Sequence, residues 1–123
     1  MDKKKILVIE DEPDQVALTR MRLEAVGFEV IAALGGEEGI KKAAAEKPDL
    51  ILLDIIMPRV DGYQVCRNLK NNPQTSAIPV IVVTAAVVRE VDKKANDFCV
   101  DYWLKKPYES SVLVAQIKTI LGD

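Results

Sequence analysis

The sequence predicts a doubly wound α/β protein with a five-stranded parallel sheet, in the order 2-1-3-4-5, and five helices. Five strand-length segments rich in Ile, Val and Leu recur along the chain, and a stretch with helical periodicity follows each of them. Several of these segments are apolar almost throughout, which is typical of strands covered by helices on both faces of a sheet. With 123 residues, 49% of them hydrophobic, we expect residues 1–123 to form one domain.

The predicted strands are, in chain order, ILVIE (6–10), FEVIAA (28–33), DLILLD (49–54), IPVIVVTA (78–85) and VDYWL (100–104). Strict alternation of strand and helix with short connections favours a parallel sheet with right-handed crossovers. The order 2-1-3-4-5 fits best, and it makes strands one and three neighbours from which the chain winds off in opposite directions. Ligands bind beyond the carboxyl ends of the strands at such a switch point.

The first predicted helix begins at Pro13, a residue suited to an initial helical position, and ends at Gly27. Apolar residues at helical intervals mark it and four further helices. They are Val16, Leu18, Met21, Leu23 and Val26 in the first helix, Ile40, Ala43 and Ala44 in the second, Val65, Cys66 and Leu69 in the third, Val91, Ala95 and Phe98 in a weakly marked fourth, and Leu113, Ile117, Ile120 and Leu121 in the fifth. Pro48 and the Asn-Asn-Pro at 71–73 end the second and third helices, and the fifth begins after Ser110 or Ser111.

Composition narrows the class of protein. The net charge of −2 provides no broad basic field, so we expect no direct partner among nucleic acids or membranes. No apolar run approaches the roughly 20 residues that span a bilayer, and the N-terminus lacks the apolar segment of a signal peptide. The sequence therefore predicts a cytoplasmic protein.

Cysteine and histidine usage narrow the chemistry. Cys66 and Cys99 are the only cysteines and lie in apolar-periodic stretches without metal-ligand spacing, so we predict free, buried thiols. The chain has no histidine, which removes the commonest general base and metal ligand. A phosphohistidine, if one takes part, must come from another protein.

Acidic residues stand at the ends of two neighbouring predicted strands. Strand one ends in Glu10 and Asp11, and strand three ends in Asp54. Two carboxylates about 4 Å apart repel each other by roughly 4 kcal/mol at an effective dielectric near 20, so such a cluster needs a counter-charge. A divalent cation supplies one, and an all-oxygen site with room for water suits Mg²⁺ better than zinc.

Two further polar residues stand at the remaining strand ends. Thr84 lies at the end of the fourth apolar run, and Lys106 follows the fifth, directly before Pro107. A hydroxyl and an ammonium facing a metal-bound carboxylate could hold the oxygens of a phosphoryl group. Asp54 would then be the nucleophile that accepts this group as an acyl phosphate.

Four segments together carry a family resemblance: the acidic pair in VIEDEPD, the segment DIIMPRVDG that begins with Asp54, the threonine of VVTA and the lysine of KKPY. Over essentially its whole length the chain resembles a response regulator receiver domain of two-component signalling, the group that includes the chemotaxis regulators. The resemblance implies a flavodoxin-like fold. It also implies a phosphoryl donor, either a histidine kinase or a phosphotransfer protein, and a downstream protein target or fused output domain.

Carried over by position, the resemblance assigns roles to the site residues. Asp54 would be phosphorylated, and Asp11 and Asp54 would ligate Mg²⁺ directly. The backbone carbonyl of Ile56 would be a further ligand, and Glu10 would act through water. Thr84 and Lys106 would contact phosphoryl oxygens.

The resemblance extends to the loops and to the switch. The Lys106 to Pro107 peptide is often cis in the family, and Gly62 would let the loop turn into helix three. Trp103 takes the position of the aromatic switch, where tyrosine or phenylalanine is usual. Activation would shift the face formed by helix four, strand five and helix five.

Taken singly, each site residue has a simpler explanation. Asp54 could cap a turn after a strand, Thr84 could be an ordinary β-branched strand residue, and Lys106 could be a solvated charge. Their occurrence together at matching strand ends favours the functional interpretation. For Trp103, simple packing stays open beside a switch role.

Three other functions fit the sequence less well. A phosphatase of the haloacid dehalogenase type needs a second aspartate two residues after the first, where this chain has Ile56. A receiver that binds partners without phosphorylation usually lacks the acceptor, the acidic pair or the lysine, which are all present here. A flavodoxin-like cofactor site needs a glycine loop after strand one, where this chain has EDEPD. We therefore expect a phosphorylation-switched signalling domain that catalyses its own phosphoryl transfer and dephosphorylation, rather than an enzyme with a separate substrate.

Overall fold

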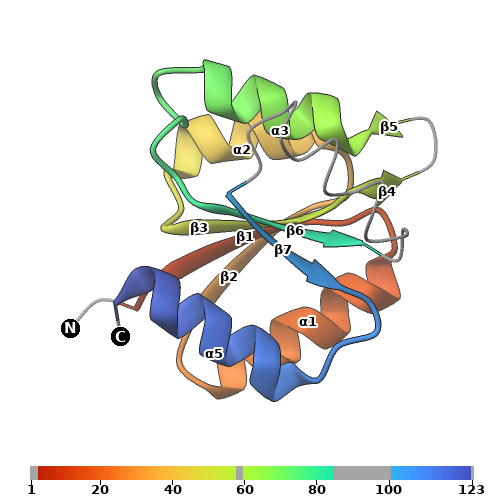
Figure 1. Ribbon diagram of the computed structural model, residues 1–123, viewed down its shortest axis with the longest axis vertical. Helices are drawn as coiled ribbons and strands as arrows, with labels where there is room; N and C mark the ends of the chain where they lie inside the picture. The colour runs from red at the N-terminus through yellow and green to blue at the C-terminus, as the bar shows by residue number, and fades with distance from the viewer. Residues whose placement is uncertain (1–2, 58–59, 85–100, 123) are drawn as a thin grey trace.

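The computed structural model describes residues 3–57, 60–84 and 101–122, and in it a parallel sheet is enclosed between two layers of helices (Figure 1). The sheet has five strands in the order β2-β1-β3-β6-β7, and every neighbouring pair is parallel. The strands are β1 (Lys5–Ile9), β2 (Glu29–Ala33), β3 (Leu50–Asp54), β6 (Val80–Thr84) and β7 (Tyr102–Lys105). The predicted strand order 2-1-3-4-5 is confirmed, with β6 and β7 as the fourth and fifth predicted strands.

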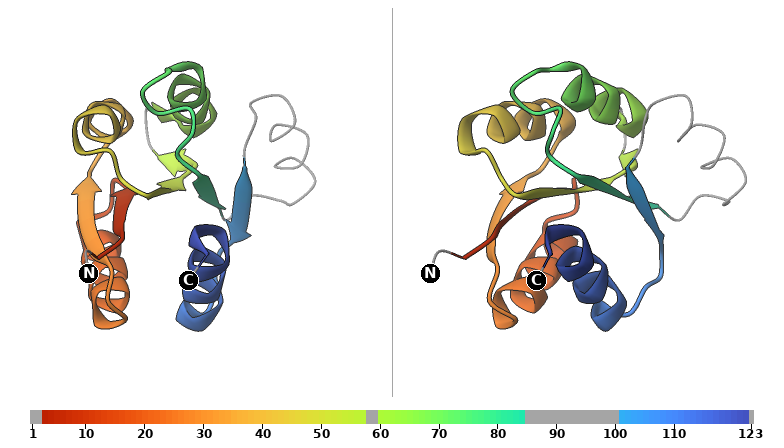
Figure 2. Two further views of the ribbon diagram at one scale, coloured as in Figure 1. Left: turned by 90° about the vertical axis from the view of Figure 1, so that its left-hand side faces the viewer. Right: turned by 60° about the vertical axis from the view of Figure 1, so that its left-hand side comes forward.

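Four helices are described: α1 (Pro13–Ala25), α2 (Gly36–Glu46), α3 (Gly62–Asn71) and α5 (Ser110–Leu121). Helices α2 and α3 cover one face of the sheet, and α1 and α5 cover the other (Figures 1 and 2). The fourth predicted helix falls within residues 85–100, outside the described residues, as does Cys99. None of the described helices combines the length and the apolar character needed to cross a membrane.

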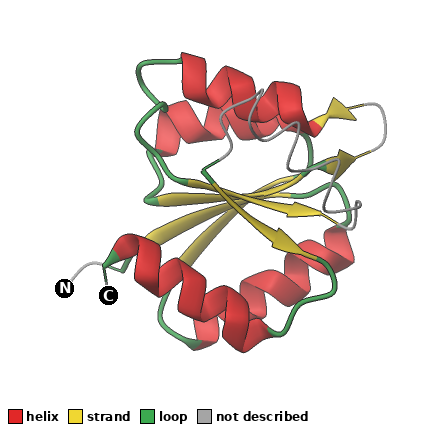
Figure 3. Ribbon diagram, in the orientation of Figure 1, coloured by secondary structure: helices red, strands yellow, loops and turns green. Residues whose placement is uncertain are grey.

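A short antiparallel pair, β4 (Ile56–Met57) and β5 (Val60–Asp61), lies between β3 and α3 (Figure 3). Sequence patterns did not predict it, because two-residue strands are too short to show any periodicity. Strand β4 begins two residues after Asp54, and its pairing with β5 holds the segment between β3 and α3 in a regular conformation.

Side chains of the sheet form two separate apolar cores, because successive residues of a strand point to opposite faces. Leu7, Leu53 and Val82 belong to the core beneath α2 and α3, whereas Val8 and Leu52 belong to the core above α1 and α5. This two-sided burial is the physical reason for the nearly continuous apolar runs in the sequence. Cys66, on α3, is buried in the first core as a thiol rather than in a disulfide, as predicted.

Helix α1 begins at the predicted residue, but not all of the apolar residues that the sequence pattern assigned to its buried face are buried. Val16 and Leu23 are buried, whereas Met21 and Val26 are 62% and 45% exposed. The helix ends shortly before Gly27, whose φ of 98° lies in the left-handed region that favours glycine.

Candidate functional site

Three carboxylates meet where β1 and β3 end. Oxygen atoms of Glu10, Asp11 and Asp54 all lie within 4.8 Å of one another. The two strands are adjacent and parallel, and the pairing of Ile9 with Leu53 brings the residues that follow them to the same edge of the sheet. The predicted convergence of these acidic residues is therefore confirmed.

Glu10 is the most buried member of this acidic cluster, with only 6% of its surface exposed. Its Oε2 atom has no hydrogen-bond partner among the described residues. The pKa of Glu10 is raised from 4.5 to about 7, mainly by burial and then by the neighbouring Asp54. A buried carboxylate oxygen without a donor points to a cation or an ordered water that should bind there.

Lys106 provides the counter-charge for this cluster among the described residues. Its Nζ atom lies 3.2 Å from Oδ2 of Asp54 and 3.5 Å from Oε1 of Glu10. Burial disfavours the charged amine, but the carboxylates of Asp54 and Glu10 outweigh that effect and raise the pKa of Lys106. The Lys106 to Pro107 peptide is cis.

The donor set fits a hard divalent cation. The cluster offers only oxygen ligands, and with all three carboxylates ionised and Lys106 protonated it carries a net charge of −2. The Oε2 atom of Glu10, which has no hydrogen-bond partner in the described part of the chain, adds an oxygen that could serve as a ligand. Such a set suits Mg²⁺, which prefers few carboxylates and keeps several waters.

Gly62 sets the path of the chain beside the acidic cluster. It is the first residue of α3, and a Cβ atom there would lie 2.4 Å from the backbone oxygen of Ile55. Any side chain would therefore push the start of α3 away from the residue that follows Asp54. The sequence predicted a glycine for a loop turn, whereas the structure shows that close backbone approach is the reason.

A cleft of about 590 Å³ opens from the acidic cluster along α1. Beyond the predicted residues, it is lined by Gln15, Thr19 and Arg22 of α1 and by Tyr108 of the loop before α5. Tyr108 is half-buried, and this burial raises the pKa of its hydroxyl. Sequence patterns do not single out these four residues, because their types are common on surfaces and only the fold brings α1 next to the loop after β7.

The remaining predicted residues have mixed outcomes. The backbone of Thr84 ends β6 and that of Ile56 begins β4, but the positions of their side chains lie outside what is described. Trp103 is half-buried and packs against the core beneath α3. Lys105 is exposed, as expected for the neighbour of Lys106 on the opposite face.

Comparison with known proteins gives one consistent result. Residues 6–118 match the response regulator receiver domain family. The chain is 41% identical over 119 residues to the alkaline phosphatase synthesis transcriptional regulatory protein PhoP of Bacillus subtilis, covering 96% of this chain and 48% of PhoP. It is 38% identical over 120 residues to Protein PilH of Pseudomonas aeruginosa, covering 96% of this chain and 98% of PilH. The chain thus spans about half the length of PhoP and nearly all of PilH.

Solved structures agree with this match. The signal receiver domain of a signal transduction histidine kinase from Syntrophus aciditrophicus superposes with a TM-score of 0.89 at 32% identity, covering 97% of this chain and 90% of that one. The chemotaxis protein CheY4 of Vibrio cholerae has a TM-score of 0.90 at 23% identity, covering 97% and 99%. At that identity the second likeness concerns the fold alone.

Proposed function

The chain belongs to the response regulator receiver domain family, the phosphoacceptor domains of two-component signalling, and we propose that Asp54 is its phosphoacceptor. The observation that carries this proposal is the position of Asp54 between an acidic pair and an ammonium. Its carboxylate lies within 4.8 Å of Glu10 and Asp11 and 3.2 Å from Nζ of Lys106, at the open end of the sheet. No other aspartate among the described residues has both kinds of neighbour.

We propose that Asp11 and Asp54 hold Mg²⁺ directly, with the backbone carbonyl of Ile56 as a further ligand and Glu10 acting through water. The unpartnered Oε2 of Glu10 supports an interaction of this kind. The bound ion would offset the charge of the three carboxylates and of the incoming phosphoryl group. This assignment uses the acidic cluster and the backbone of Ile56, and needs no residue from outside the chain.

In the proposed reaction, an oxygen of Asp54 attacks the phosphorus of a phosphohistidine on a partner protein. The bond between phosphorus and the imidazole nitrogen breaks as the bond to Asp54 forms, and the imidazole leaves with the electron pair. Lys106 neutralises charge on the phosphoryl oxygens, and its contact with Asp54 supports this role. Thr84, at the end of the neighbouring strand β6, is proposed as a second contact to these oxygens.

The donor is proposed to be a histidine kinase or a phosphotransfer protein, because the chain has no histidine of its own. We expect the exchange in the cytoplasm. The domain would catalyse both this transfer and the later hydrolysis of the acyl phosphate, and would act on no separate substrate. The output would be a changed protein-binding face that includes β7 and α5, with Thr84 and Trp103 as the switch residues, read by a downstream protein or by an output domain.

Incubation with acetyl phosphate and Mg²⁺, followed by intact mass measurement, tests the acceptor. Wild-type protein should gain the mass of one phosphoryl group, and Asp54→Asn should gain none. Asp14→Asn, an exposed aspartate in the first turn of α1, is the matched control and should be modified like the wild type. Labelling of Asp54→Asn at the wild-type rate would refute the assignment.

A further inference from the structure

A second charged cluster lies at the opposite end of the sheet, around Lys70 near the end of α3. The Lys70 side chain is only 13% exposed, and it forms an ion pair with Asp101. Its Nζ atom also donates to the backbone oxygens of Ile78 and Ser76, at 2.7 and 3.2 Å. An ammonium has three N–H donors, so these three acceptors satisfy it completely.

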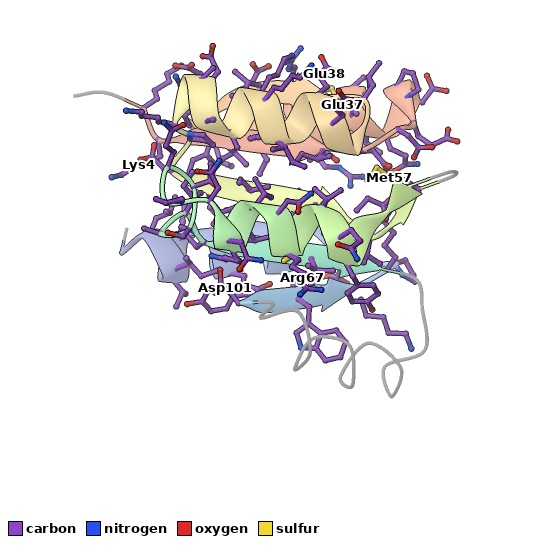
Figure 4. The ribbon with its side chains drawn as sticks, turned by 90° about the horizontal axis from the view of Figure 1, so that it is seen from above. Lys4, Glu37, Glu38, Met57, Arg67 and Asp101 are labelled. Atoms are coloured by element: carbon purple, nitrogen blue, oxygen red, sulfur yellow. The ribbon has the colours of Figure 1, made fainter. Side chains whose placement is uncertain are left out.

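Asp101 extends this cluster to the first residues of two strands. Its Oδ2 atom accepts a hydrogen bond of 3.1 Å from the backbone amide of Val80, which begins β6. Asp101 itself directly precedes β7, and Figure 4 shows it where that strand begins, next to α3. Because Ile81 pairs with Tyr102 in the ladder, the contact between Val80 and Asp101 continues the same register by one residue.

The strand that Asp101 precedes needs such a register contact. Strand β7 has four residues and lies at the edge of the sheet, with β6 as its only neighbour among the described strands. Its first three residues, Tyr102, Trp103 and Leu104, place apolar side chains on both faces, and none of them is fully buried. Register is weakly specified where alternation is absent, so the apolar pattern alone does not fix how β7 sits on β6.

The register of β7 decides which lysine reaches the acidic cluster. Lys105 and Lys106 are consecutive, and in the observed register Lys105 is exposed whereas Lys106 contacts Asp54. A shift by one residue would exchange their faces and would turn Trp103 away from the core beneath α3. A one-residue shift of β7 would therefore put Lys105 in place of Lys106 at the acidic cluster, so the composition of the site depends on the register of this strand.

We infer that the Lys70–Asp101 ion pair, bonded to the backbone of residues 76–80, fixes the register of β7 and so positions Lys106 and Trp103. Lys70 and Asp101 are positioning residues, because they lie at the amino ends of the strands and act through β7. The effect on phosphorylation depends on the proposed role of Asp54, whereas the effect on Trp103 does not.

Two variants disrupt this pair, and one matched control variant disrupts an equivalent contact elsewhere. Lys70→Met removes the ammonium, and Asp101→Asn removes the ion pair while keeping an acceptor for the Val80 amide. In the control, Lys42→Met, a more exposed lysine that also donates to a strand carbonyl is lost from the other edge of the sheet. There Lys42 donates to the Ala32 oxygen of β2 at 2.5 Å and pairs with Glu38 at 3.2 Å.

We expect both pair variants to lower the maximal rate of phosphorylation at saturating acetyl phosphate by roughly tenfold, since small misplacements of a catalytic group are costly. Mg²⁺ affinity should not fall, because its proposed ligands lie outside β7 and a displaced Lys106 would remove a competing charge from Asp54 and Glu10. Acrylamide should quench Trp103 more strongly in both variants, and the signal is unambiguous because the chain has one tryptophan. Lys42→Met should leave the rate and the quenching at wild-type values.

The alternative outcomes are distinct. If both pair variants lose thermal stability as Lys42→Met does, but keep the wild-type maximal rate and quenching, the pair is merely structural and the inference is overturned. Should Lys70→Met fail to fold, Asp101→Asn alone decides, because it keeps the bond to Val80. If the wild type is not phosphorylated on Asp54, the proposed function fails, while Trp103 quenching still supports or overturns the register role.

Discussion

The ammonium of Lys106 lies 3.2 Å from the carboxylate of Asp54, which is 52 residues away in the sequence. The same ammonium contacts Glu10 at 3.5 Å, so one cation serves two members of the acidic cluster. A divalent ion bound by these carboxylates would have to share them with Lys106. The positive charge of Lys106 therefore weakens the binding of the metal, whereas it favours the binding of the phosphoryl group.

This opposition predicts that Lys106→Met binds Mg²⁺ more tightly. Removing a unit charge a few ångströms from the ion should raise the affinity roughly tenfold, since like charges repel by about 1 kcal/mol or more at that distance even in water. The same variant should be phosphorylated much more slowly, because the phosphoryl oxygens lose their cation. Calorimetric titration with Mg²⁺ measures the first effect, and phosphorylation with acetyl phosphate measures the second.

Lys105→Met is the matched control for that experiment. Lys105 is the exposed neighbour of Lys106 and has the same charge, but it faces away from the cluster. It should bind Mg²⁺ and accept phosphate like the wild type. Equal Mg²⁺ affinities in all three proteins would contradict the shared-carboxylate arrangement.

The raised pKa of Glu10 predicts a pH dependence of stability in metal-free protein. The folded form binds this proton with a pKa of about 7, against 4.5 ordinarily, so the folded state holds the proton more tightly than the unfolded state. The contribution of Glu10 to the free energy of unfolding should therefore be greatest below about pH 4.5 and should fall as the pH rises towards 7. The total loss should be on the order of 3 kcal/mol.

Thermal unfolding with EDTA between pH 5 and 8 measures this effect. Glu10→Gln should remove most of the pH slope and should unfold at a higher temperature than the wild type at pH 8. Added Mg²⁺ should stabilise the wild type most at high pH, where Glu10 is ionised. A wild-type slope that persists unchanged in Glu10→Gln would show that another group causes it.

Three glycine substitutions should differ in cost according to what a new Cβ atom meets. In Gly62→Ala the atom meets the backbone of Ile55 at 2.4 Å, so we expect a loss of about 3 kcal/mol or more. In Gly39→Ala it meets the side chain of Ile9 at 2.5 Å, and the loss should be smaller, about 1–2 kcal/mol, because that side chain can move and alanine favours the helix. In Gly35→Ala nothing lies within 4 Å. Urea unfolding should rank the three variants in this order.

The side chain of Thr75 is predicted to stabilise the end of α3. It is 1% exposed, and its hydroxyl donates a 2.6 Å hydrogen bond to the backbone oxygen of Leu69. Thr75→Val keeps the shape but leaves that oxygen without the donor, which should cost about 1–2 kcal/mol. Thr119→Val, which removes an exposed bond to Ala115 at 2.9 Å, should change stability by less than about 0.5 kcal/mol. Similar losses in both variants would contradict the role of burial.

The sequence predicted the strand order and the meeting of Glu10, Asp11 and Asp54. Both follow from local rules, because apolar runs define strands and the carboxyl ends of parallel strands share one edge of the sheet. The exposure of Lys105 beside Lys106 follows from an equally local rule, the alternation of side chains along a strand.

Other features depend on how distant parts of the chain meet. The exposure of Met21, the close approach of Gly62 to Ile55 and the pair of Lys70 with Asp101 are of this kind. No local sequence pattern predicts these features, because each depends on how segments distant in the sequence pack against one another. Sequence alone thus determined which chemical groups stand at each strand end, whereas the tertiary structure decided which charges pair and which backbones touch, since Coulomb attraction and steric exclusion act through space.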